Sequence, residues 1–334
     1  MKINLTKENK PEEVMMRDVY ASTLIELAKK NKLICALDAD LMRSMGMAAF
    51  AEAFHERMFN VGVGEANMIG IAAGLSATGK IPFAHSFGTF VTRKAYDQVF
   101  LSGAYARLNI RIVGSDPGIT AAYNGGTHMP FEDLGIMRNI PTMTVLEPVD
   151  SAMLENLIQQ LAVLKGMFYI RLLRRYPVKV YERGSVFDIG KGVILKEGKD
   201  VSIISTGILV AESLKAAENL EKRGISSRVV NMFTIKPIDR ELVEDCARET
   251  GAILTCENHN IINGLGSAVA ESLGETFPVP MERVGCRDLF GEVGPVEYLI
   301  ERFGMSAKHI ETMAMRVIDR KGKIMQEVGV RDYG

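Results

Sequence analysis

Short runs of apolar and β-branched residues alternate along the first half of the chain with longer stretches of helical periodicity. The helical stretches lie at 17–30 and 65–77, and the strand-like runs at 33–37, 81–83, 110–113, 142–146 and 168–172. Strands that alternate with helices form parallel sheets covered by helices. The pattern therefore predicts an α/β domain with a mainly parallel sheet.

The second half repeats this alternation. Strand-like runs lie at 201–205, 227–231 and 252–257, with helical stretches at 209–223, 239–249 and after the turn NHNIINGLG. Between the halves, residues 176–200 carry Pro177 and four glycines, which is typical of an interdomain linker. We expect two α/β domains, at 1–185 and 186–334, each a mainly parallel sheet flanked by helices.

Composition excludes several classes of protein. With 40 Lys+Arg against 41 Asp+Glu, no overall field favours nucleic acid or a membrane surface. No apolar run reaches the length of a transmembrane helix, and the charged N-terminus lacks the apolar run of a signal peptide. The four cysteines stand singly, without metal-ligand spacing, and are expected to be reduced and buried. We expect a cytoplasmic protein with no nucleic-acid or membrane partner.

A carboxylate stands where a glycine-bearing turn enters a helix, in the segment VGVGEANM. This residue is Glu65. By pattern alone, a glutamate in the first turn is stabilised by the helix N-terminus and needs no further role.

Several segments taken together resemble one family. In chain order they are VGVGEANMIGIAAGLSATG, SFGTFVTRKAYDQ and NGGTHMPFEDLGIMRNIPTMTVLEPVD, which resemble the pyrimidine-binding domain of transketolases. The later ENHNIINGLGSAVAESL resembles the C-terminal domain of that family. The resemblance extends from about residue 17 to 320. It implies a thiamine-diphosphate-dependent transferase that moves a two-carbon ketol unit from a ketose phosphate to an aldose.

The resemblance also implies which residues meet the cofactor. Glu65 would hydrogen-bond the aminopyrimidine ring and so help remove the thiazolium proton, which requires a protonatable carboxylate in a dry pocket. Phe87 and Phe90 would form an aromatic wall, although helical spacing alone would suit core packing. Asp40 and Leu41, in a loop directly after a strand, would approach the cofactor.

One position departs from the family. Transketolases often have a third aromatic residue where this chain has Arg93. The departure leaves open whether Arg93 contacts the cofactor or turns toward the substrate.

Substrate contacts are implied by the same resemblance. His128 would meet a hydroxyl or carbonyl of the donor, where a neutral imidazole donates a hydrogen bond or shuttles a proton. Asn124 replaces the usual aspartate, which leaves the preferred sugar open. The phosphate would be met near Arg17, Ser44 and either Arg174 or Arg175, although an arginine pair at a strand end is also typical of solvated surface.

The chain lacks the Gly-Asp-Gly motif with which transketolases hold Mg²⁺ and the cofactor's diphosphate. A diphosphate needs a metal with oxygen ligands, and we identify no metal ligands here. The turn Asn263-Gly264-Leu265-Gly266 is no GxGxxG motif, and we assign no catalysis to Glu257 or His259. We therefore expect a partner chain, the N-terminal transketolase subunit, that carries the diphosphate-binding domain and the Mg²⁺ (or Ca²⁺). Two copies of each chain are expected, with self-association through the helix at 65–77.

Other functions stay open. A relative with another donor is one, such as a deoxyxylulose-phosphate synthase-like enzyme or a sulfo- or deoxy-sugar transketolase. The beta subunits of 2-oxo acid dehydrogenases share the architecture, but the Gly-Thr-His-Met-Pro run favours transketolase. A non-catalytic regulatory partner is a further alternative, against which Glu65, His128 and the two phenylalanines argue.

Overall fold

A computed structural model describes residues 1–331 of the chain. Its larger sheet has seven strands in the order β10-β5-β6-β4-β3-β1-β2. All neighbours are parallel except β10, which pairs antiparallel with β5. The strands are β1 Ile34–Asp38, β2 Met58–Asn60, β3 Ile81–Phe87, β4 Arg111–Ser115, β5 Thr144–Leu146, β6 Phe168–Leu172 and β10 Thr234–Lys236. Because β10 comes from the second half of the chain, the two halves share this sheet.

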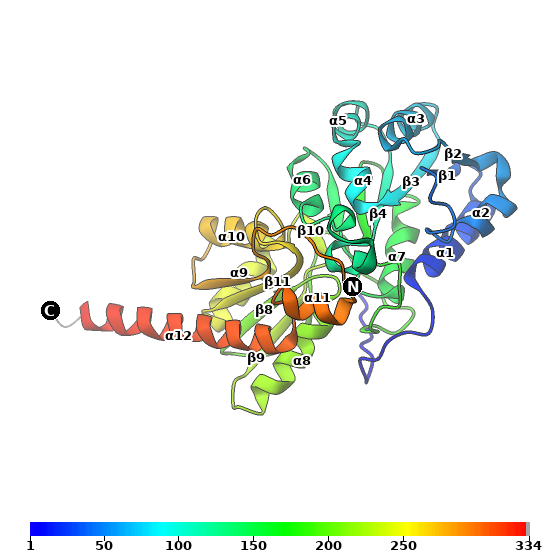
Figure 1. Ribbon diagram of the computed structural model, residues 1–334. Coiled ribbons are helices and arrows are strands. Elements are labelled where there is room, and N and C mark those ends of the chain that lie inside the picture. Colours follow the sequence, from blue (N-terminus) through cyan, green and yellow to red (C-terminus); the bar gives the residue numbers. More distant parts are fainter. Residues whose placement is uncertain (332–334) are drawn as a thin grey trace.

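Helices cover both faces of the larger sheet (Figure 1). The α-helices are α1 Met16–Lys30, α2 Ala48–Ala53, α3 Glu65–Ala77, α4 Gly88–Arg93, α5 Tyr96–Gln98, α6 Asp133–Asn139 and α7 Ser151–Leu161. Short 3-10 or π turns lie at η1 His55–Arg57, η2 Val99–Tyr105, η3 Gly118–Asn124 and η4 Gly126–His128. Strand β1 has apolar side chains on both faces of the sheet. Ile34 packs with α1 and α7 on one face, and Leu37 packs with α3 on the other. Such strands are apolar on both sides, which is the pattern of a parallel sheet.

The smaller sheet has five strands in the order β12-β11-β8-β9-β7, and only β7 is antiparallel to its neighbour among the described residues. Its strands are β7 Val193–Lys196, β8 Val201–Ser205, β9 Ser227–Asn231, β11 Ile253–Asn260 and β12 Met281–Cys286. Its helices are α8 Leu209–Glu221, α9 Arg240–Thr250, α10 Leu265–Glu275, α11 Val296–Arg302 and α12 Ala307–Arg331. The predicted fold class, two mainly parallel sheets flanked by helices, is confirmed.

The segment predicted as a linker is more ordered than its composition suggests. Residues 193–196 form β7, and residues 178–186 pair with the N-terminal arm through bridges such as Leu5–Tyr181. The glycines serve close packing here: a Cβ added to Gly198 would lie 2.1 Å from the backbone carbon of Ser227. The segment predicted as an interdomain linker is therefore structured, and its last part, β7, belongs to the smaller sheet.

All four cysteines are buried and free, as predicted. Within residues 1–331, no helix combines the length and the apolar character that crossing a membrane requires.

Candidate functional site

The candidate site residues gather at one edge of the larger sheet. They follow the carboxyl ends of β1, β2, β3, β4 and β6, or lie at the start of α1 beside them. In open α/β sheets this edge is where ligands bind, because the loops leaving parallel strands converge there. The residues are Arg17, Asp40, Leu41, Ser44, Glu65, Phe87, Phe90, Arg93, Asn124, His128, Arg174 and Arg175.

Glu65 is the first residue of α3, and its side chain is only 3% exposed. Its Oε1 accepts a hydrogen bond from the Ser86 hydroxyl at 3.4 Å, and its Oε2 lies 3.6 Å from Lys94 Nζ. Both contacts are long for a buried carboxylate, which ordinarily has close partners. The carboxylate therefore has capacity left for a donor that enters from outside the chain.

An aromatic cluster lies beside this carboxylate. Phe87 and Phe90 have ring centroids 6.1 Å apart, and the His128 imidazole lies 5.9 Å and 5.1 Å from them in edge-on geometry. Lys94 connects the cluster to Glu65, since its ammonium lies 4.5 Å from the Phe90 centroid. Phe87 ends β3 and Phe90 belongs to α4, so the two rings meet without lying on one helix.

Arg93 points toward the turn that carries His128. Its Nε lies 3.0 Å from Glu132 Oε1, and its Nη2 donates to the Thr127 carbonyl at 3.1 Å and to the Thr89 hydroxyl. Burial raises the pKa of Glu132, and the guanidinium of Arg93 acts against that rise. Thr127 Oγ1 in turn lies 2.9 Å from His128 Nδ1, which orients the ring.

The side chains of Arg174 and Arg175, which follow β6, point to two different places. Arg174 Nε lies 3.0 Å from Asp116 Oδ2, and its guanidinium lies 5.2 Å from the Phe87 centroid. Arg175 is exposed and lines a separate cavity of about 510 Å³ together with Tyr123 and Tyr176. Arg174 is thus the member of the pair that contacts the aromatic cluster.

The start of α1 meets the loop after β1 close to this arginine pair. Arg17 Nη1 donates to the carbonyl of Ser44 at 3.0 Å. The preceding amide, Met16 N–H, donates to the carbonyl of Arg175 at 3.0 Å. The backbone therefore brings Arg17, Ser44 and Arg175 to one place, although the Arg175 side chain lines the separate cavity.

The loop after β1 is fixed by two polar side chains to which the sequence assigned no role. Asn60 Oδ1 accepts from the amide of Asp40 at 3.1 Å and from that of Gly62 at 3.0 Å. Asp38 Oδ1 accepts from the amide of Leu41 at 2.6 Å. Asp40 has a φ of 66°, which an aspartate tolerates better than most residues. These bonds set the position of both predicted cofactor contacts.

Asn124 ends η3 and is exposed. The same turn contains Ala122 in an unfavourable backbone conformation, with φ 49° and ψ −116°. Such a conformation persists only where the surroundings impose it. Asn258 of β11 anchors the start of this turn, because its Oδ1 accepts from the Ile119 amide at 2.9 Å and its Nδ2 donates to the Pro117 carbonyl at 2.8 Å.

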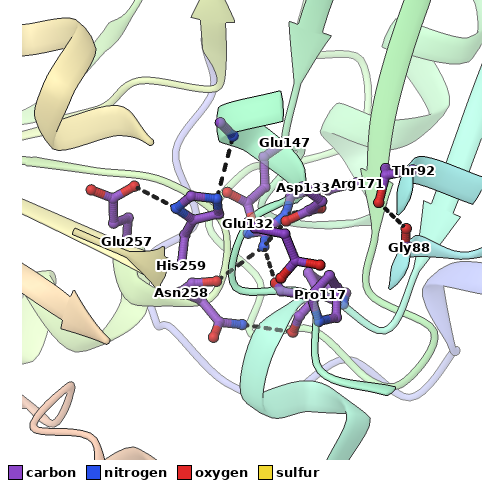
Figure 2. A network of polar contacts seen from close by, with 12 residues as sticks. Gly88, Thr92, Pro117, Glu132, Asp133, Glu147, Arg171, Glu257, Asn258 and His259 are labelled. Atoms are coloured by element: carbon purple, nitrogen blue, oxygen red, sulfur yellow. Dashed lines mark hydrogen bonds and ion pairs between the residues drawn. The ribbon is translucent and has the colours of Figure 1, made fainter. Parts of the chain in front are cut away.

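A buried polar network joins the two sheets beneath this edge (Figure 2). Arg171, near the carboxyl end of β6, donates to both carboxylate oxygens of Asp133, at 2.8 Å and 2.7 Å, and to Glu147 at 2.8 Å. It also donates to the carbonyls of Pro130 and Asn258, both at 3.1 Å. A charged residue inside the apolar run FYIRL was the available sequence signal for this network.

The second domain adds two titratable groups to the network. Glu257 accepts from the amides of Leu265 and Gly266 at the start of α10, at 2.7 Å and 2.8 Å, and burial raises its pKa to about 7. The Gly135 amide donates to His259 Nε2 at 3.3 Å, and burial lowers the pKa of this histidine to about 4. Their contacts are structural, within the protein core.

The edge of the sheet suits the pyrimidine half of thiamine diphosphate better than its diphosphate half. A buried carboxylate with spare accepting capacity and two adjacent aromatic rings fits a flat, nitrogen-rich heterocycle. In the described part of the chain, no three or more His, Cys, Asp or Glu side chains come together as a metal would require. The residues at this edge would therefore hold the pyrimidine ring of the cofactor.

Comparison with known families identifies the chain. Residues 12–177 match the model of the transketolase pyrimidine-binding domain, and residues 190–310 match the transketolase C-terminal domain. The chain belongs to the transketolase family.

Its relatives include proteins of the same extent. It is 54% identical over 319 residues to the 6-deoxy-6-sulfo-D-fructose transketolase subunit of Clostridium sp. strain MSTE9, covering 96% of this chain and 99% of that one. It is 31% identical over 308 residues to an apulose-4-phosphate transketolase subunit of Phocaeicola vulgatus, covering 92% and 98%.

Solved structures agree with this placement. One described as a split gene transketolase, inactive beta4 tetramer, superposes with a TM-score of 0.86 at 42% identity, covering 92% of this chain and 99% of that one. The Campylobacter jejuni transketolase superposes with a TM-score of 0.77 at 21% identity, and the match spans 93% of this chain but 48% of that enzyme. The latter likeness concerns the fold alone.

Proposed function

We propose that this chain is the pyrimidine-binding subunit of a thiamine-diphosphate-dependent transketolase that moves a two-carbon ketol unit from an anionic ketose to an aldose. The observation that carries the proposal is the buried, incompletely satisfied Glu65 carboxylate beside Phe87, Phe90 and His128. Bound thiamine diphosphate supplies the carbon nucleophile that accepts and passes on the two-carbon unit.

The roles of the chain's own residues follow from their chemistry. Glu65 holds a proton at the pyrimidine ring nitrogen and exchanges it there. Phe87 and Phe90 keep water from this face of the ring, and Asp40 and Leu41 contact it from the loop after β1. Arg93 acts indirectly, because it binds the Thr127 carbonyl in the turn that carries His128.

Substrate binding is assigned to the cationic side of the same edge. His128 donates a hydrogen bond to the donor's oxygen or accepts its proton, with the ring oriented by Thr127. Arg174 and Arg17, with Ser44 and the more distant Arg175, bind the anionic end of the sugar. Asn124 contacts a sugar hydroxyl and sets the sugar preference.

A second chain completes the enzyme in this proposal. It carries the diphosphate-binding domain and most of the Mg²⁺ or Ca²⁺ ligands, and two copies of each chain form the assembly. The proposal is supported by relatives named as subunits that match this chain over nearly their whole length, and by the solved relative described as an inactive tetramer of one chain type.

The donor is an open choice between two anionic ketoses. Guanidinium groups bind phosphate and sulfonate alike, so Arg17 and Arg174 suit both. The first candidate is a ketose 6-phosphate. The second is a 6-deoxy-6-sulfo ketose, because the chain is 54% identical to a subunit named as a 6-deoxy-6-sulfo-D-fructose transketolase subunit. Turnover with a ketose 6-phosphate and with its 6-sulfo analogue, measured side by side on the assembled enzyme, decides between them.

The test of the core proposal is Glu65→Gln in the assembled enzyme. Exchange of the cofactor's thiazolium proton, measured by quenched-flow NMR, should slow by about 10²–10⁴-fold, because general acid–base assistance is typically of that size. The control is His128→Ala, which should reduce turnover but leave this exchange nearly unchanged. Exchange at the parental rate in Glu65→Gln, or tight cofactor binding by this chain alone in calorimetry, would contradict the proposal.

A further inference from the structure

The loop between β12 and α11 presents apolar side chains to solvent. Phe290 is 96% exposed, Val293 67% and Leu289 47%. Isolated exposed apolar residues are ordinary, but a cluster that includes a fully exposed phenylalanine indicates an interaction surface. We refer to Leu289, Phe290 and Val293 as the Phe290 patch.

Three side-chain contacts brace the loop that carries this patch. Cys286 Sγ donates to the carbonyl of Leu289 at 3.2 Å. Farther along, Glu292 forms an ion pair with Arg302 at 2.5 Å and accepts from the Tyr298 hydroxyl at 3.3 Å. A partner that docks on the patch therefore meets an ordered surface, and little conformational entropy is lost on binding.

The loop also rests directly on the turn that carries His128. A Cβ on Gly126 would lie 2.2 Å from the carbonyl oxygen of Gly291, so this approach requires glycine. A Cβ on Gly125 would lie 2.8 Å from Val293 Cγ2. Figure 1 shows the orange segment before α11 running up to the green turns between β4 and α6. The Phe290 patch is thus continuous with the mouth of the candidate site.

A recess opens beside the same loop. It has a volume of about 740 Å³, and Asp288 lines it together with Phe131, Glu132 and Arg138. Glu132 is the ion-pair partner of Arg93, so the recess also reaches the site. An exposed apolar protrusion next to a polar recess is the arrangement of an interface with an apolar centre and a polar rim.

We propose that the Phe290 patch is a docking surface for the chain that carries the diphosphate-binding domain. This inference rests on the proposed function, in which that chain must stand against the mouth of the site to complete it. Val293 of the patch meets Gly125, and Gly291 of the same loop meets Gly126, so the patch borders the turn that carries His128 at the mouth of the site. The patch belongs to the second domain, which thereby gains a direct part in assembly.

The experiment measures the affinity between this chain and the separately expressed chain of the same organism that matches a transketolase diphosphate-binding domain. Phe290→Asp should weaken the complex at least about tenfold in sedimentation or interferometry, since central aromatic residues dominate interface energetics. Phe290→Leu should recover most of the loss. Thermal melting of the variants alone should match the parent, because the side chain makes no core contact.

The matched control is Val163→Asp. Val163 is 78% exposed, and it lies in the loop that enters β6, at the opposite edge of the sheet from the site. Its substitution should leave the affinity within about twofold of the parent. Parental affinity in Phe290→Asp would overturn the inference, as would a change confined to the self-association of this chain, which would assign the patch to a second copy. If the parental chains form no complex, the proposed function itself fails.

Discussion

Arg171→Met should destabilise the protein more than any other single change in the polar core. Arg171 is 1% exposed and donates three hydrogen bonds to the carboxylates of Asp133 and Glu147, besides two to carbonyls. Removing one partner from a buried ion pair typically costs about 3–5 kcal/mol, because the remaining charge stays buried without compensation. Here two carboxylates are left together, so we expect a loss near the upper end of that range.

Arg111→Met is the matched control. Arg111 is also fully buried, but it donates to the backbone carbonyls of Leu161, Asn109 and Leu164, which are neutral. Leaving a buried neutral acceptor without its donor costs about 1–3 kcal/mol, and several acceptors share this donor. Both variants replace a buried arginine with the same methionine side chain. The difference between their losses of unfolding free energy therefore measures the cost of leaving the carboxylates of Asp133 and Glu147 without their cation.

Denaturant unfolding at 25 °C measures both losses. The chain contains no tryptophan and nine tyrosines, so far-UV circular dichroism and tyrosine fluorescence serve as independent probes. The two variants should differ by about 2 kcal/mol at pH 8, which is the difference between the two typical costs. Burial already raises the pKa of Glu147, and loss of Arg171 removes the cation that opposes this rise. Protonation should therefore shrink the penalty of Arg171→Met at pH 5. Equal losses in the two variants, or a penalty that ignores pH, would refute the ion-pair argument.

Glu257 and Lys94 offer two further tests. Burial raises the pKa of Glu257 to about 7 in the folded state, whereas a glutamate in the unfolded chain loses its proton near pH 4.5. Between these two values only the folded state binds the proton, so the free energy of unfolding falls as the pH rises toward 7. Glu257→Gln should therefore gain stability relative to the parent between pH 5 and pH 8, by up to about 3 kcal/mol, and a constant difference across this interval would contradict the raised pKa. Lys94→Met removes the cation 3.6 Å from Glu65 and should weaken cofactor binding by the assembled enzyme about two- to fivefold, a modest effect because Lys94 is half exposed. Lys94→Arg should keep the parental affinity in calorimetry, and equal losses in both variants would show that shape rather than charge matters there.

Most of the sheet could be predicted because buried parallel strands have a strong local pattern. The bounds of β6, β8 and β9, and those of α3, agree with the predicted runs. The short strand β10 could not be predicted in its place, because three residues carry little pattern and its pairing with β5 is a tertiary contact. Helix α7 lay outside the predicted elements, although Asp150 caps it by accepting from the Met153 amide at 3.0 Å.

The positions of the candidate site residues could be predicted from motifs, whereas the contacts that support them could not. Glu65, Phe87 and His128 lie in recognisable segments, but the contact of Lys94 with Glu65 depends on how α4 packs beside α3. The contact of Arg171 with Asn258 joins residues 87 positions apart in the sequence. No local periodicity encodes such a distance, so the network appears only once both domains are folded together.

The second domain contributes to the candidate site by holding the turns that carry Asn124 and His128. The turns between β4 and α6 carry Asn124 and His128, and they include the strained Ala122, so they need an external constraint. Two groups from the second domain provide it: Asn258 binds the start of η3, and Gly291 packs against Gly126 at the start of η4. Arg93 binds the same segment from the first domain, through the carbonyl of Thr127. The turn that carries His128 is thus held by contacts within this chain. Under the proposed function, the partner therefore has to supply the ligands of the diphosphate rather than the order of this turn.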